Sequence, residues 1–399
     1  MALDLSKVIA QVGDMIARLK AGRQERQECL NRALDILHRQ SEDIEGLARK
    51  VEASRTTWLV AGLVDGLDRR YGAEPLPAEF AIIATDGSHI DVDRHRATRC
   101  YLINIGSVLL RYGKEPEALL DSQPYLYADD EELVITLPGV KGREQPVEGT
   151  LLGIKRSVEE CRRLVELAGG LPPGSSSLAL LDGTLILWGL EAYPEFVTDA
   201  LLGKGFLKCL EEMRRLNKDR RIALASYISF PRSTDVVNTL RVALCPHETV
   251  DTDRYCPTCE SRECDAVAGV RDRELFNDLL DSGERSALFT SKSYIVEKHY
   301  GGHRISFFYL NVGDEIARVE IPHWVAIDNT LLNLAHTLVL DQCQRGQGYP
   351  VALSEAHEKA VVTGADRENF WELVESSLVD EHLPTPGSAK SRSKRTRWV

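Results

Sequence analysis

Two kinds of hydrophobic pattern alternate along the chain: apolar residues at helical spacing and short unbroken apolar runs. Helical spacing extends through residues 3–70, including the segment 58–64, until Pro75 interrupts it. This pattern predicts an N-terminal helical region over residues 1–75. A long helical arm ahead of the first strand is typical of a packing or dimerising element.

Two of the unbroken runs, at 80–86 and 178–182, predict buried strands that each end in an aspartate followed by a glycine. Residues 98–112 predict a further strand, and apolar positions in 151–168 mark one face of an amphipathic helix. The acidic stretch 114–150 predicts loops, with one short strand at residues 133–137.

The rest of the chain alternates between the two patterns. Predicted helices cover residues 195–216, 233–243, 270–281 and 328–344, with another beginning near Ser354. Predicted strands cover 221–229 and 350–353, with a hairpin at 304–322. Strands interleaved with helices in this way predict an α/β fold, a mixed sheet with helices on both faces.

Charge and hydropathy narrow the class of protein. No run of about 18 apolar residues spans a membrane, and no signal-peptide core is present, so a cytoplasmic location is expected. The net charge of −12 argues against a broad basic surface for duplex DNA. It leaves room for an enzyme with acidic metal ligands whose basic residues line one channel or come from a partner.

The two aspartates that end apolar runs are the first candidates for chemistry. Asp86 and Asp182 would stand at the carboxyl ends of strands, where α/β sheets present ligands. If those strands are neighbours, the two carboxylates repel each other unless a cation offsets their charge. Divalent ions there could activate water for attack on a phosphodiester. The alternative is that each Asp-Gly pair is only a turn.

Three segments, taken together, resemble the NurA nuclease family. They are Asp86-Gly87-Ser88-His89, Leu181-Asp182-Gly183-Thr184-Leu185 and the stretch from Gly348-Tyr349-Pro350 to Ala356-His357-Glu358. Each piece is weak alone, but their order is fairly specific, and the resemblance covers about residues 78 to 375. It implies a ribonuclease H-like core, dependence on Mn²⁺ or Mg²⁺, cutting of single-stranded DNA and 5′→3′ degradation of duplex ends. It also implies a homodimer that works with HerA, a hexameric DNA-translocating ATPase.

The resemblance further implies a metal site of two aspartates, a helical glutamate and a C-terminal histidine. Asp86, Asp182 and His357 match it directly, and Tyr349 matches a tyrosine implicated in activity. Without the resemblance, a surface histidine on a helix, flanked by Glu355 and Glu358, is the favoured explanation of His357.

The glutamate of that site falls within 151–168, where two candidates lie side by side. Glu159 and Glu160 both flank the apolar face; Glu160 is preferred, although helical spacing does not decide. Lys292 is an alternative catalytic candidate that could steady charge on a phosphate, and its other explanation is a solvated lysine. No Gly-x-x-x-x-Gly-Lys-Ser/Thr loop occurs, so ATP hydrolysis is not expected of this chain.

Four of the nine cysteines are clustered. Cys245, Cys256, Cys259 and Cys264 have the ligand count for structural Zn²⁺ or an iron–sulfur cluster, with one C-x₂-C pair. The alternative is four unligated thiols in a loop. This cluster is not expected to belong to the nuclease site.

The sequence therefore predicts three parts: a helical region at 1–75, a NurA-like nuclease domain at 76–380 with a Cys-rich insertion at 245–264, and a basic disordered tail at 384–399. The tail could follow a DNA backbone, contact the ATPase or only aid solubility, and the last is the commonest role of such a tail. Its basic residues are Lys390, Arg392, Lys394, Arg395 and Arg397. Two alternatives to a nuclease stay open: a catalytically inactive DNA-binding subunit of a translocase complex, and a zinc or iron–sulfur protein centred on the cysteines.

Overall fold

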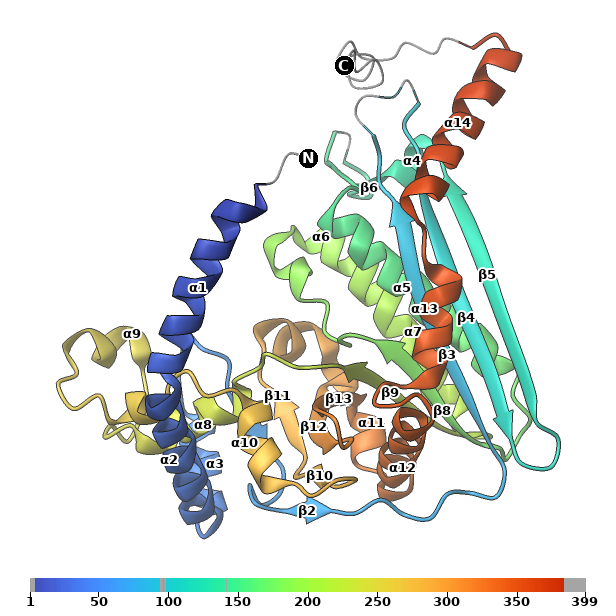
Figure 1. The fold of residues 1–399 in the computed structure, drawn as a ribbon. Coiled ribbons are helices and arrows are strands. Elements are labelled where there is room, and N and C mark those ends of the chain that lie inside the picture. The colour runs from blue at the N-terminus through green and yellow to red at the C-terminus, as the bar shows by residue number, and fades with distance from the viewer. Residues whose placement is uncertain (1–3, 94–95, 97, 141, 384–399) are drawn as a thin grey trace. The chain divides into compact units, whose positions relative to one another are not determined.

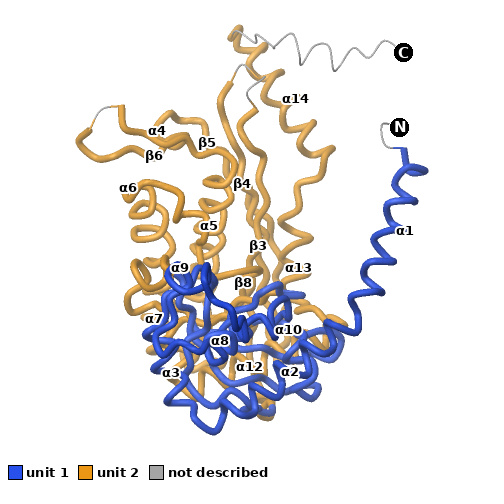
Figure 2. The backbone as a smooth tube through the Cα atoms, turned by 90° about the vertical axis from the view of Figure 1, so that its left-hand side faces the viewer, with its two compact units in different colours: residues 1–72, 229–293, 306–318 blue, residues 73–228, 294–305, 319–399 orange. Residues whose placement is uncertain are grey.

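The computed structural model describes residues 4–93, 96, 98–140 and 142–383. The chain divides into two compact units, shown in different colours in Figure 2. Unit 1 comprises residues 1–72, 229–293 and 306–318, and unit 2 comprises residues 73–228, 294–305 and 319–399. None of the described helices is both long and apolar enough to cross a membrane.

Unit 2 is built on a mixed sheet with the strand order β9-β8-β3-β4-β5 (Figure 1). The strands are β3 Phe80–Ile90, β4 Tyr101–Tyr112, β5 Glu117–Tyr127, β8 Ser176–Asp182 and β9 Arg221–Ile228. β8 is parallel to β3 and to β9, whereas β4 is antiparallel to β3 and to β5. The first half of β3 is fully buried, as expected for a strand whose two faces are both covered.

Helices cover both faces of this sheet. On one face α5 (Thr150–Gly169) is tied to β3 by Thr85 Oγ1, which donates to the Glu160 carbonyl at 3.0 Å. On the other face α13 (Val351–Ala360) lies against Gly106 of β4. Unit 2 also contains α4 Asp130–Leu133, β6 Val134–Thr136, β7 Glu144–Pro146, η1 Trp188–Ala192, α6 Glu195–Thr198, the π-helix η2 Asp199–Phe206, α7 Leu207–Leu216, the π-helix η5 Val296–Tyr300, η6 Gly301–His303, α11 His323–Ala326, α12 Asn329–Arg345 and α14 Gly364–Asp380. The predicted α/β architecture is confirmed, and the ribonuclease H-like character of the core stays a prediction.

Unit 1 surrounds a separate hydrophobic core that includes Leu37, Leu67, Phe276 and Phe289. Its elements are α1 Leu5–Ala21, α2 Arg23–Ser41, α3 Ile44–Glu52, β1 Ala61–Leu63, β2 Arg70–Tyr71, α8 Asp235–Leu244, α9 Thr252–Tyr255, α10 Asp272–Leu279, β10 Arg285–Ser286 and β11 Phe289–Ser291. The predicted hairpin at 304–322 is confirmed as β12 (Ile305–Asn311) and β13 (Ile316–Pro322). Helix α1 buries no residue, so its apolar face is open to solvent.

Three predicted elements were wrong. Residues 58–64 do not continue the helical arm, because β1 pairs with β11 and Thr239 bonds the backbone of Ala61. The predicted loop region 114–150 contains β5, whose almost fully exposed side chains give no apolar alternation to detect. The predicted strand at 350–353 is the first turn of α13, because Pro350 supplies the N-cap position of a helix.

Candidate active site

Asp86 lies inside β3 and not at its end. The sequence predicts a turn at this Asp-Gly pair, but every residue from Phe80 to Ile90 pairs with β4, so the strand continues past it and that prediction was wrong. The Asp86 side chain is only 13% exposed, and its Oδ2 lies 2.7 Å from His357 Nδ1. Strand β3 and helix α13 thus bring together two residues that the sequence places far apart.

Close packing fixes the position of α13. A Cβ on Gly106 would lie 2.1 Å from the Ala356 carbonyl oxygen, so only glycine allows the helix to approach β4 this closely. Asn104 Nδ2 and Ser88 Oγ both donate to the carbonyl of Ala360 at the end of the helix. These contacts hold the helix that presents His357 to Asp86.

Asp182 is the last residue of β8, as the sequence predicts. Gly183 follows with φ of +80°, a left-handed conformation that glycine adopts readily. The Tyr349 hydroxyl donates to Asp182 Oδ1 at 3.0 Å, and the Tyr349 ring meets the edge of Tyr227. Burial and the Asp182 carboxylate raise the pKa of Tyr349, so the phenol stays protonated and remains a donor.

Glu160 is the third carboxylate, and it is buried, with 6% of the residue exposed. Burial raises its pKa to about 7; the Arg156 guanidinium opposes the shift, and the carboxylates of Asp86 and Asp182 add to it. The carboxylates of Asp86 and Asp182 therefore both act on Glu160. Glu159 instead forms an ion pair with Arg162 at 2.5 Å, so the geometry favours Glu160 over Glu159.

Gly87 allows the Glu160 side chain to lie close to the backbone of β3. A Cβ on Gly87 would lie 2.6 Å from Glu160 Oε1 and 2.9 Å from Arg156 Cγ, so a larger residue would displace both side chains. Arg156 Nε lies 2.9 Å from Glu160 Oε1, but the two are not aligned for a hydrogen bond. Sequence reasoning missed both Gly87 and Arg156; the four-residue spacing of Arg156 and Glu160 on a helix is the signal that could have found the arginine.

The donor set fits a hard divalent cation. Burial raises the pKa of Glu160, the carboxylates of Asp86 and Asp182 add to the shift, and His357 Nδ1 lies 2.7 Å from Asp86, so the predicted ligands supply carboxylate oxygens and an imidazole nitrogen. Glu160 Oε1 is buried with no hydrogen-bond partner among the described residues. Within the described part of the chain, no group of three or more His, Cys, Asp or Glu residues is already placed to hold a metal ion. Asp86, Glu160, Asp182 and His357 remain predicted ligands.

Other predicted site residues lie elsewhere. Lys292 belongs to unit 1, where its ammonium group is 2.5 Å from Glu52. The basic tail residues Lys390, Arg392, Lys394, Arg395 and Arg397 lie outside the described residues.

The four clustered cysteines all lie in unit 1. Cys245 is the C-cap residue of α8, and Arg241 of the same helix donates to the Cys264 carbonyl at 3.3 Å. Burial and the nearby thiols of Cys245 and Cys259 raise the pKa of Cys256. The cysteines are therefore neighbours, and their role as metal ligands stays a prediction.

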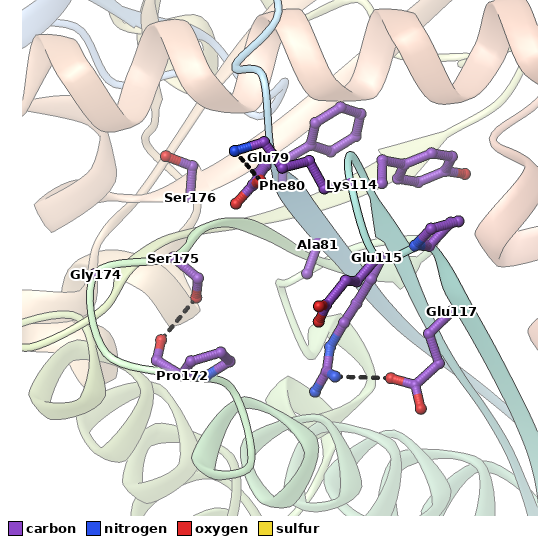
Figure 3. Close-up of a pocket in the computed structure, with 13 residues that line it drawn as sticks. Glu79, Phe80, Ala81, Lys114, Glu115, Glu117, Pro172, Gly174, Ser175 and Ser176 are labelled. Atoms are coloured by element: carbon purple, nitrogen blue, oxygen red, sulfur yellow. Dashed lines mark hydrogen bonds and ion pairs between the residues drawn. The ribbon is translucent and has the colours of Figure 1, made fainter.

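A cavity of about 810 Å³ lies at the opposite end of the sheet, where β3 and β8 begin (Figure 3). Four of its charged residues form two ion pairs: Lys114 with Glu79 at 3.8 Å, and Arg111 with Glu117 at 2.7 Å. Phe80, which lines it, is about 20 Å along β3 from Asp86. The cavity is thus separate from the carboxylates.

Comparison with known proteins places this site within a family domain. The NurA domain model matches residues 80–362, which include all three carboxylates, Tyr349 and His357. Among solved structures, the NurA nuclease from Sulfolobus solfataricus has a similar fold, with a TM-score of 0.51 and 14% identity over 96% of this chain and 98% of that one. The comparison with curated proteins found no match. The family model covers well over half of the 399 residues, and the chain therefore belongs to the NurA family.

Proposed function

We propose that this protein is a metal-dependent DNA nuclease, a single-strand endonuclease and 5′→3′ exonuclease. The observation that carries the proposal is the buried Glu160 whose pKa both Asp86 and Asp182 raise, within a NurA domain. A buried glutamate whose pKa is raised by burial and by two further carboxylates is costly to keep in a fold unless it serves a charged ligand. The NurA nuclease of similar fold supports the same reaction class.

The proposed ligands for Mn²⁺ or Mg²⁺ are Asp86, Glu160, Asp182 and His357. Such a cation, when bound, supplies the positive charge that polarises a scissile phosphate and favours deprotonation of the attacking water. Tyr349 orients Asp182 by donating a hydrogen bond to it, and His357 fixes Asp86 in the same way. Burial of Glu160 keeps its carboxylate away from bulk water.

The physiological role we propose is DNA end resection in double-strand break repair, with a HerA-type ATPase as partner and a homodimer as the working form. The two alternatives make different demands on the carboxylates. A catalytically inactive DNA-binding subunit would not need them, and neither would a zinc or iron–sulfur protein centred on the cysteines.

The experiment that tests the proposal uses purified protein and end-labelled single-stranded DNA, with Mn²⁺ or with EDTA. We expect cleavage with Mn²⁺ and none with EDTA. Asp86→Asn and Asp182→Asn should each abolish cleavage without altering the fold, because each removes a negative charge that the cation requires. Asp130→Asn, a change at an exposed residue of α4, should leave cleavage unchanged. Activity in EDTA, or full activity of either site variant, would refute this mechanism.

A further inference from the structure

Arg156 is a positive group placed against the carboxylates of the candidate site. It lies on α5 one turn before Glu160, with its Nε 2.9 Å from Glu160 Oε1. The Glu160 side chain is 8% exposed, whereas that of Arg156 is 32% exposed. The arginine therefore extends from the buried carboxylate towards solvent.

The stem of Arg156 crosses β3 beside Asp86. A Cβ on Gly87 would lie 2.9 Å from Arg156 Cγ and 3.1 Å from Cδ, so the stem rests on the glycine backbone. The contact that places the guanidinium beside a carboxylate of the candidate site is the 2.9 Å approach of its Nε to Glu160, whose pKa Asp86 and Asp182 raise.

The donors of Arg156 are largely unused. A guanidinium carries five N–H groups, and among the described residues Glu160 is the one carboxylate within ion-pair distance of Arg156. Its Nε makes no hydrogen bond to any described residue. The other two arginines of α5 differ, because Arg162 pairs with Glu159, and Arg163 pairs with Glu166 and Asp121.

We propose that Arg156 is a substrate-binding residue that donates to a phosphate of the DNA strand at the candidate site. This inference rests on the proposed nuclease function. Three carboxylates repel a phosphodiester, and an arginine at their border offsets that repulsion with a planar pair of donors that matches two phosphate oxygens. Arg156 thereby holds the strand next to the group that Asp86, Glu160 and Asp182 form.

Binding measured without cleavage tests the inference. Fluorescein-labelled oligothymidylate is titrated with protein in EDTA at several salt concentrations, and anisotropy gives Kd. Arg156→Gln should weaken binding roughly fivefold to tenfold, the scale of a charge-assisted hydrogen bond, and should lower the salt slope by about 0.7. Arg156→Lys should keep the slope while recovering only part of the affinity, because lysine lacks the paired donors.

Arg162→Gln is the matched control, because it neutralises an arginine of the same helix that already has a partner. Its Kd and salt slope should equal those of the unmodified protein. Unchanged binding by Arg156→Gln that retains its thermal unfolding midpoint would overturn the inference. If Arg156→Gln does not fold, Arg156→Lys decides: affinity equal to that of the unmodified protein overturns the inference, and partial affinity supports it.

A double-mutant cycle separates substrate binding from a purely local role. If Arg156 served only to offset the charge of Glu160, Arg156→Gln would have no effect on binding in a Glu160→Gln background, and that result overturns the inference. Loss of affinity in both backgrounds supports it. Because these measurements use EDTA, a protein that binds through Arg156 but never cleaves with Mn²⁺ would refute the proposed nuclease and not this contact.

Discussion

The glycines of the two Asp-Gly pairs have different roles: one allows a turn of the backbone and the other leaves space for neighbouring side chains. Gly183 has a positive φ and turns the chain after β8, whereas Gly87 lies in regular strand β3 and leaves space for Glu160 and Arg156. The apolar runs before Asp86 and Asp182 were enough to identify both aspartates as candidates. Sequence could not decide between Glu159 and Glu160, because the choice depends on where α5 crosses β3.

The substitution Gly87→Ala tests the close approach at the scale of one atom. The new Cβ would lie 2.6 Å from Glu160 Oε1 and would push that carboxylate away from Asp86. We expect single-strand cleavage to fall about a hundredfold, the effect associated with misplacing a catalytic group by ~1 Å. The free energy of unfolding should fall by about 1 kcal/mol or less, measured by thermal or urea denaturation.

The control for Gly87→Ala is Gly153→Ala on α5, where an added Cβ meets nothing within 4 Å. That variant should cleave normally, and its helix should be slightly more stable, because alanine has the higher helix propensity. Normal cleavage by Gly87→Ala would show that Glu160 does not need its present position.

Among the strands of the unit 2 sheet, the buried ones could be predicted from the sequence, whereas the exposed strand at the edge of the sheet could not. β8 and α5 lie where the sequence placed them, and β3 begins where predicted but runs past Asp86 to Ile90. β5 was missed because an exposed edge strand carries no hydrophobic signal. α13, which carries His357, was misplaced at its start because the Val-Ala-Leu run after Pro350 suits a short strand and a helix equally.

The segment that carries Cys245, Cys256, Cys259 and Cys264 makes its own prediction. Four neighbouring thiols with one C-x₂-C pair suit a single structural metal ion or cluster per chain. Elemental analysis of protein purified without chelator should find zinc or iron in stoichiometric amount. The double change Cys256→Ser and Cys259→Ser should abolish that metal and increase proteolysis within 245–264, because the metal ties the segment together.

Cys29→Ala serves as the control, since Cys29 packs against the core of unit 1 and is not one of the four. It should retain the metal in full. Four freely titratable thiols in metal-free native protein would contradict the prediction, and so would a disulfide within the segment.

For the molecule as a whole, the net charge bears on how well the protein can bind duplex DNA without a partner. A chain with a charge of −12 holds duplex DNA weakly, because duplex binding depends on neutralising phosphates with basic residues. We therefore predict that duplex degradation requires a HerA-like ATPase and ATP hydrolysis, while slow cutting of single strands does not. A resection assay with labelled duplex, with and without the co-purified ATPase, measures the difference.

Two controls make that assay specific. A non-hydrolysable ATP analogue should stop duplex degradation but leave single-strand cutting unchanged. With the Asp86→Asn nuclease, the active ATPase should still translocate along the duplex, but the DNA should not be degraded. Efficient duplex degradation by the isolated nuclease without ATP would show that the acidic surface is no barrier and that the motor is not needed.

The long separations within the candidate site have a consequence for how the protein is made. Asp86 and His357 are 271 residues apart, and Tyr349 is 167 residues from Asp182. A nascent chain exposes both aspartates on the ribosome long before α13 emerges. With the proposed ligand set, the ability to cut DNA therefore arises only after α13 has been made, and a product of stalled translation that stops before α13 lacks His357 and cannot complete the site.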